Sequence, residues 1–128
     1  MKVVEEKISL SELKEMASRM FNSLVKATVD VEKGILVVDA DLHSDEEAYL
    51  LDKGSKQENI WGINIYPDKD IRNMIEFDSI INVRPSFGNN SRGVEDKDIQ
   101  KKITDIVISK ISFEWKIFSI NNKLLENG

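Results

Sequence analysis

The sequence predicts an α+β fold. We expect a mostly antiparallel sheet of four to five strands with about three helices packed on one face, in the order (β)αββαββα. Two patterns lead to this prediction. Apolar and polar residues alternate in several short segments, as in strands with one buried face, and apolar residues recur at helical spacing in others. The first six elements also follow the ferredoxin-like order βαββαβ, if a weak N-terminal strand forms.

The N-terminal elements have clear local signals. Residues 3–8 favour an extended backbone but include three consecutive charges, which predicts an edge strand at most. Ser9 and Glu12 have the spacing of a capping box, in which side chains satisfy the free amides at a helix start. Apolar residues then recur at helical spacing, so we expect a helix over residues 10–22.

A hairpin and a short helix follow. Residues 25–31 alternate, and a Glu-Lys-Gly turn leads to the β-branched segment 35–41, which predicts two antiparallel strands. Ser44 begins a second capping box, and acidic residues suit the first turn of a helix over 45–51. Gly54 is expected to end this helix.

The second half predicts two more strands and a final helix. Residues 61–66 alternate as a third strand. In the fourth, 75–84, one face is apolar and the other is unusually polar, and Ser79 is a candidate bulge. Apolar residues at helical spacing predict the helix over 96–112, and 113–128 fits either a strand or more helix.

The chain length predicts a single α+β domain over residues 1–112, with a partly ordered C-terminal extension over 113–128. Trp115 and Phe118 make this C-terminal region the expected contact of a homo-oligomer. We expect a soluble cytoplasmic protein, because the charged N-terminus lacks a signal-peptide pattern and no apolar run is long enough for a membrane span.

Composition excludes several classes of function. A net charge of −5 and an isoelectric point near 5.0 disfavour binding to nucleic acid or to an anionic membrane, since such proteins are usually basic. The chain has no cysteine, which excludes disulfides, thiolate metal sites and a cysteine nucleophile. Neither a P-loop nor a nucleophile-elbow motif is present, and we expect no cofactor and no bound metal.

A polar loop over residues 82–96 is the most informative stretch. Arg84 and Arg92 present planar paired donors that suit a phosphate or a carboxylate, and Asn89 and Ser91 add neutral donors. However, the next helix begins with acidic residues, which repel an incoming anion. The alternative is internal, with the arginines paired to nearby carboxylates so that they stiffen the loop.

Two further groups of polar residues are candidate sites. If the third and fourth strands pair, Glu76 and Asp78 share a sheet face with Asn64 and Tyr66. Two carboxylates there would divide acid and base roles or bind Mg²⁺, and a salt-bridged surface is the alternative. His43, the only histidine, follows two alternate aspartates in a pattern that suits Zn²⁺ or Mn²⁺, although a lone histidine at a helix start more often caps or packs.

Six short motifs together resemble one family of small bacterial and archaeal proteins, a domain of unknown function. The motifs are L-H-x-D at 42–45, G-S-K-Q at 54–57, W-G-x-N-x-Y-P at 61–67, E-F-D-S at 76–79, I-N-x-R-P at 81–85 and G-N-x-S-R-G-V-x-D at 88–96. The resemblance covers roughly residues 3–112. It implies no activity, but it places the polar residues in one motif set that suits a shared site or a shared internal network.

These patterns predict a small domain that binds an anionic small molecule through the polar loop, beside paired carboxylates. The candidate ligand-binding residues are Arg84, Arg92, Asn89, Ser91, Asn64 and Tyr66, and the weaker candidate catalytic residues are Glu76, Asp78 and His43. One alternative is a structural or protein-interaction domain in which these residues form a salt-bridge network. A second alternative is a metal-dependent hydrolase.

Overall fold

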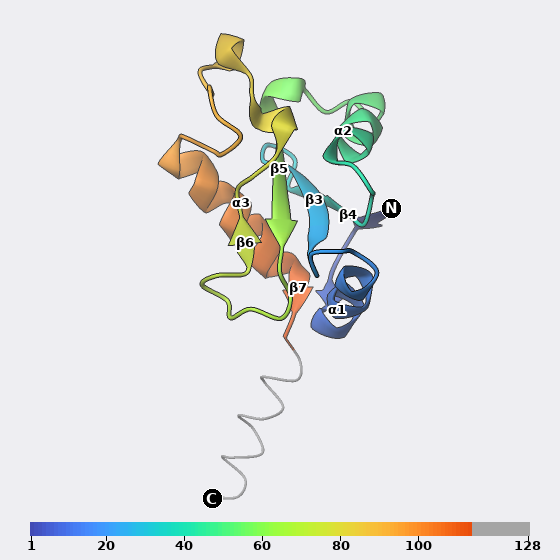
Figure 1. Ribbon diagram of the computed structural model, residues 1–128. Coiled ribbons are helices and arrows are strands. Elements are labelled where there is room, and N and C mark those ends of the chain that lie inside the picture. Colours follow the sequence, from blue (N-terminus) through green and yellow to red (C-terminus); the bar gives the residue numbers. More distant parts are fainter. Residues whose placement is uncertain (114–128) are drawn as a thin grey trace, which may run out of the picture.

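The computed structural model describes residues 1–113, which form an α+β fold (Figure 1). The elements are β1 (Lys2–Val4), β2 (Ile8–Ser9), α1 (Leu10–Ser18), β3 (Val25–Asp30), β4 (Ile35–Val38), α2 (His43–Asp52), η1 (Gln57–Asn59), β5 (Ile60–Ile65), β6 (Ile75–Glu76), η2 (Ile80–Asn82), η3 (Pro85–Phe87), α3 (Lys97–Lys110) and β7 (Ile111–Ser112). The predicted fold class and its mostly antiparallel sheet are therefore confirmed.

The main sheet has the strand order β1-β4-β3-β5-β6, with every neighbouring pair antiparallel. A separate short pair, β2 and β7, is parallel. In a ferredoxin-like sheet the strand after the second helix would lie beside the first strand, whereas here β5 pairs with β3. The order of elements along the chain matches the ferredoxin-like pattern but the order of strands in the sheet does not, because sequence order leaves open on which side of a hairpin the next strand adds.

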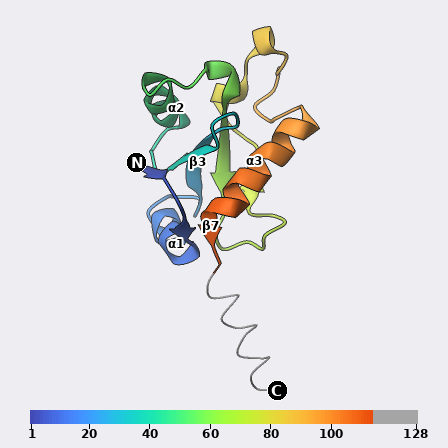
Figure 2. The same ribbon diagram turned by 180° about the vertical axis from the view of Figure 1, so that it is seen from behind.

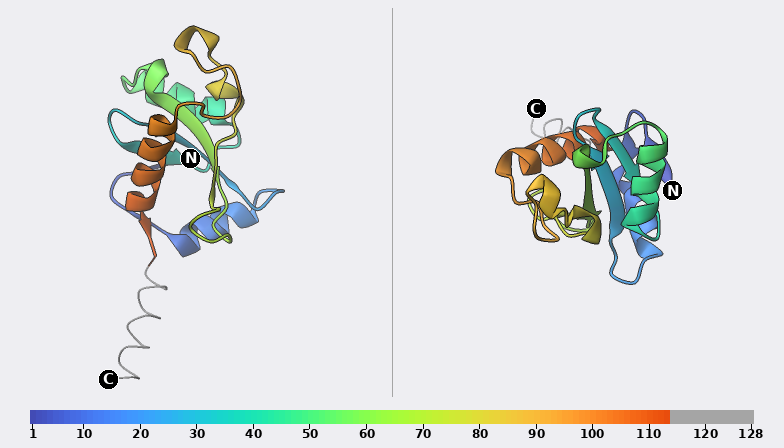
Figure 3. Two further views of the ribbon diagram at one scale, coloured as in Figure 1. Left: turned by 90° about the vertical axis from the view of Figure 1, so that its left-hand side faces the viewer. Right: turned by 90° about the horizontal axis from the view of Figure 1, so that it is seen from above.

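The helices cover both faces of the sheet (Figures 2 and 3). α1 and α3 pack on one face and bury the larger apolar core with it. α2 packs on the opposite face, where Leu50 joins a smaller cluster with Val37 and Ile60. The prediction that the helices lie on one face was therefore wrong.

Buried polar contacts explain this difference. Thr28 and Asp30 lie on the side of β3 that its alternation predicts to face solvent, yet both are fully buried under α2 and the turn that follows it. Thr28 Oγ1 donates to Glu46 Oε1 over 2.8 Å, and Ser55 Oγ donates to Asp30 Oδ2 over 2.5 Å. Because these groups satisfy one another, a polar strand face can be buried here.

Of the two predicted capping residues, Ser9 caps its helix and Ser44 does not, and the cap of α3 was not predicted. Ser9 Oγ accepts a hydrogen bond from the amide of Glu12, and Asp96 caps α3. The capping box at Ser44 is not formed, because α2 already begins at His43 and no side chain caps it.

The fourth strand is much shorter than the predicted segment 75–84. β6 ends at Glu76 and the chain continues as two 3-10 turns, η2 and η3. Asn82 replaces the missing strand: its Oδ1 accepts from Gly62 N over 2.8 Å and its Nδ2 donates to Gly62 O over 2.9 Å. Gly62 is needed there, since a Cβ would lie 2.6 Å from the side chain of Ser79.

Trp115 and Phe118 lie outside the described residues, so the extension and the oligomer contact stay predictions. Among residues 1–113 no helix is long and apolar enough to cross a bilayer.

Candidate functional site

The polar loop is held to the sheet by its own side chains. Asn89 is 3 % exposed, and its Nδ2 lies within 3.0 Å of the carbonyl oxygens of Asn82, Ser91 and Gly93. Its Oδ1 accepts from the amide of Glu95 over 2.9 Å. The Ser91 hydroxyl oxygen accepts a hydrogen bond from the Gly93 amide, so Asn89 and Ser91 both make hydrogen bonds inside the loop.

Arg84 is buried and faces protein carbonyls. Its Nη1 donates to Gln57 O, and its Nη2 donates to Ile60 O over 2.5 Å. The guanidinium also lies over the Trp61 ring, 4.5 Å from the centroid. Burial lowers the pKa of Arg84, with the nearby Glu47 carboxylate opposing that shift. Arg84 therefore ties the loop to η1 and the start of β5, whereas Arg92 pairs with Asp78, so the two arginines do not form the predicted clamp.

Four of the other predicted residues lie together beside β5 and β6. Glu76 Oε1 accepts from Asn64 Nδ2 over 2.8 Å and from the Tyr66 hydroxyl over 3.1 Å. Asn64 Nδ2 also reaches the backbone carbonyl of Asp78. Burial and the Glu76 carboxylate raise the pKa of Tyr66. The polar face predicted from strand parity is therefore present, although β6 contributes only its last residue to it.

Arg92 pairs with the second carboxylate of this face. Its Nε donates to Asp78 Oδ1 over 2.7 Å, and this contact raises the pKa of Arg92. Both side chains are partly exposed, so the pair contributes little to stability. Asp78 is thus neutralised by an arginine, while Glu76 is oriented by neutral donors.

His43 lies at the start of α2, against β5. It is 8 % exposed, and its Nε2 lies 2.7 Å from the carbonyl oxygen of Ile63, so Nε2 carries the proton. Burial lowers the pKa of His43 more than this hydrogen bond raises it; Lys26 and Arg92 lower it further, and Asp78 opposes them. The ring is therefore neutral near pH 7.

We expect the His43 ring to titrate below its ordinary pKa of about 6.5. Because the folded protein resists this protonation, the contribution of His43 to stability is full above about pH 6.5 and is lost as the pH falls below it. His43 is the only histidine, so an NMR titration of its ring protons needs no assignment. A midpoint at or above the ordinary value would contradict the buried, neutral ring.

Tyr66 and Glu76 of the polar face line a surface hollow of about 560 Å³, which is formed by β6 and the loop that connects β5 to β6 and which we call the β5–β6 hollow. It is lined by Tyr66, Lys69, Asp70, Arg72, Asn73, Ile75 and Glu76. Asp70 shapes the connecting loop, because its Oδ1 accepts hydrogen bonds from the amides of Arg72 and Asn73.

Two cations of this hollow were not among the predicted residues. Lys69 Nζ lies 4.2 Å from the centroid of the Tyr66 ring. The side chain of Arg72 is exposed and has no hydrogen bond or ion pair with the rest of residues 1–113. A signal was present in the sequence, because two basic residues and an Asx-turn aspartate follow the predicted third strand within a few positions.

Neither predicted carboxylate pattern forms a metal-binding cluster. No group of three or more His, Asp or Glu side chains in the described part of the chain is arranged to hold a metal ion. Asp39, from the pattern that includes His43, pairs instead with Arg19 over 3.1 Å.

Comparison with known proteins gives one match. The family model described as "Protein of unknown function (DUF5674)" matches residues 2–110, which span every element from β1 to α3. No curated protein and no solved structure matches the chain.

Proposed function

The chain belongs to this family of unknown function, and the family description names no activity. From the geometry of the chain itself, we propose that it binds a small polar molecule with an anionic group in the β5–β6 hollow. The observation that carries the proposal is that Lys69 and Arg72 line the hollow without an acidic partner among the described residues. A phosphate or carboxylate would supply that partner.

The proposed ligand lies in the β5–β6 hollow and not at the arginine loop, where the sequence predicted it. Arg84 is buried against backbone carbonyls, and Arg92 faces the Asp78 carboxylate through its Nε, so the two guanidiniums do not form a shared clamp for an anion. Tyr66 and Asn73 add polar groups to the hollow, and an anion there would be oriented by neutral donors as well as by charge.

A structural or interaction role is the second candidate. It is favoured by the internal contacts of the polar loop, whose turns leave Ile80 63 % and Phe87 51 % exposed. If the motif residues exist only to hold this loop, anions will leave the melting temperature unchanged.

Ethyl phosphate and propionate are suitable probes of the hollow. Arg72→Ala is expected to weaken binding of either anion by about tenfold, because it removes one charge-assisted contact. Its melting temperature should stay close to that of the unmodified protein, since Arg72 has no described partner to lose. Isothermal titration calorimetry measures the affinity.

Lys102→Ala is the matched control, because Lys102 is exposed on α3 and the substitution removes the same charge. Equal affinities for the unmodified protein, Arg72→Ala and Lys102→Ala would overturn the proposed site.

A further inference from the structure

We infer that the ligand of the β5–β6 hollow is amphoteric, carrying an ammonium or a similar N–H donor group in addition to its phosphate or carboxylate. This inference rests on the proposed function and narrows it. The first reason is charge balance. The hollow is lined by two basic side chains and two acidic ones, so an anion alone would leave carboxylate charge facing it without a partner.

The two acidic residues of the hollow, Asp70 and Glu76, differ in their hydrogen bonds. Asp70 Oδ1 accepts hydrogen bonds from two backbone amides and from Asn73 Nδ2, which commits it to the shape of the loop. Glu76 has no such backbone role. Its Oε1 is fixed by Asn64 and Tyr66, while no donor in the described part of the chain reaches its Oε2. Glu76 is therefore an oriented carboxylate with one oxygen open to a ligand donor.

Asn64 fixes Glu76 from inside the sheet. The two residues are paired across β5 and β6, and Asn64 is only 6 % exposed. Both contacts of its amide group use Nδ2, which fixes the orientation of the side chain. Its Oδ1 is buried without a hydrogen-bond partner. Because this oxygen is buried and Asn64 does not line the hollow, Asn64 positions Glu76 and does not itself contact a ligand there.

The ligand can thus be described by its two ends. Lys69 and Arg72 hold the anionic end, and Glu76 Oε2 accepts an N–H donor of the other end. A single small molecule spans both ends, because Lys69, Arg72 and Glu76 line the same hollow.

The test uses two sets of matched compounds and calorimetry. Phosphoethanolamine, ethyl phosphate and ethanolamine form one set, and β-alanine, propionate and propylamine form the other. In each set the first compound has both charges, the second has only the anion and the third only the cation. We expect the amphoteric member to bind about tenfold more tightly than the anion, which matches one charge-assisted hydrogen bond. Comparing the sets shows whether the anionic end is phosphate or carboxylate.

Glu76→Gln should bring the affinity for the amphoteric compounds down to that for the anions, and it should not weaken the anions themselves. Glutamine keeps an oxygen for Asn64 and Tyr66, so the variant is expected to fold. Glu15→Gln is the control, since Glu15 is exposed on α1 and the substitution removes the same charge.

Two results would contradict these proposals, and they can be told apart. Equal binding of the amphoteric compound and the anion, unchanged in Glu76→Gln, would overturn the amphoteric ligand and leave the anion site standing. Absence of binding by all six compounds would overturn both proposals.

Discussion

Replacing Asn82 by alanine is expected to lower the free energy of unfolding by about 3–4 kcal/mol. Asn82 is fully buried, and its carboxamide makes three hydrogen bonds to backbone groups, two with Gly62 and one with the carbonyl of Arg92. Alanine leaves all three backbone groups without a partner. Because the same side chain joins β5 to both ends of the polar loop, the loop should also lose protection against hydrogen exchange.

Urea unfolding followed by circular dichroism measures this loss. Asn82→Asp is a useful second variant, since it keeps the volume and the acceptor for Gly62 N but loses the two donated bonds. Asn90→Ala is the matched control, because Asn90 is exposed in the same loop and only its backbone amide is used. A loss below about 1 kcal/mol in Asn82→Ala, no larger than in the control, would show that the carboxamide does not replace a strand.

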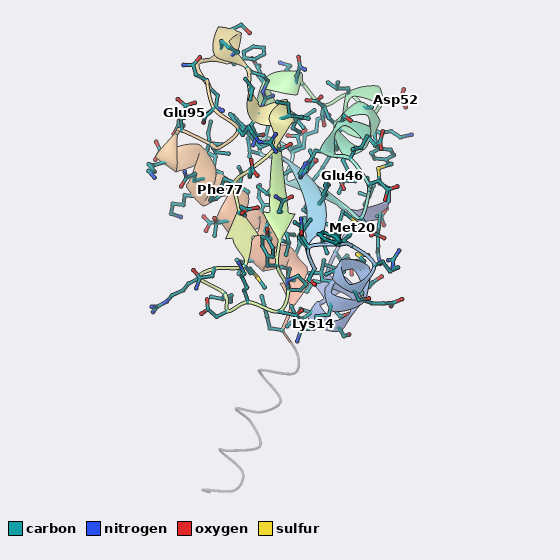
Figure 4. All side chains as sticks on the ribbon, viewed as in Figure 1. Lys14, Met20, Glu46, Asp52, Phe77 and Glu95 are labelled. Atoms are coloured by element: carbon teal, nitrogen blue, oxygen red, sulfur yellow. The ribbon has the colours of Figure 1, made fainter. Side chains whose placement is uncertain are left out.

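Between about pH 5 and pH 8, the contribution of Glu46 is expected to make the protein less stable as the pH rises, and below about pH 6.5 it opposes the contribution of His43. Glu46 is fully buried between α2 and the sheet (Figure 4), and burial raises its pKa to about 8. The unfolded carboxyl loses its proton near pH 4.5, while the folded one keeps it until about pH 8. In this window unfolding releases a proton, so a higher pH favours the unfolded state, by at most about 5 kcal/mol in total.

Glu46→Gln should remove this dependence and should be more stable than the unmodified protein at about pH 8. Glutamine fits the existing contacts, because its oxygen can accept from the Ala40 amide and its amide group can donate to Thr28 Oγ1. Glu15→Gln, on the exposed face of α1, should leave the pH profile unchanged. Parallel profiles for the unmodified protein and Glu46→Gln would contradict a protonated, buried carboxyl.

Much of the fold follows from local patterns. The alternation in β3 and β5, the β-branched residues of β4 and the apolar spacing in α1 and α3 predict these elements within a few residues. The covering of the second sheet face could not be predicted in the same way. Polar residues such as Thr28 normally mark a solvated face, and only the packing of α2 brings Glu46 to Thr28 as a partner.

The candidate site was predicted less completely than the fold. Strand parity places Asn64, Tyr66 and Glu76 on one face, and their hydrogen bonds agree with that. The path of the polar loop carries no periodic signal, so the sequence cannot show that Arg84 turns back to the carbonyl groups at η1 and the start of β5. The β5–β6 hollow was missed because it depends on the shape of a loop and not on a repeat of residues.

The central claim is that the ligand lies in the β5–β6 hollow while the arginine loop is internal. Mapping amide chemical shifts during a titration with phosphoethanolamine tests this claim most directly. We predict that the shifted amides cluster in residues 66–76 and that those of residues 84–93 move little. Shifts concentrated in residues 84–93, with residues 66–76 unchanged, would contradict the account and return the ligand to the arginines.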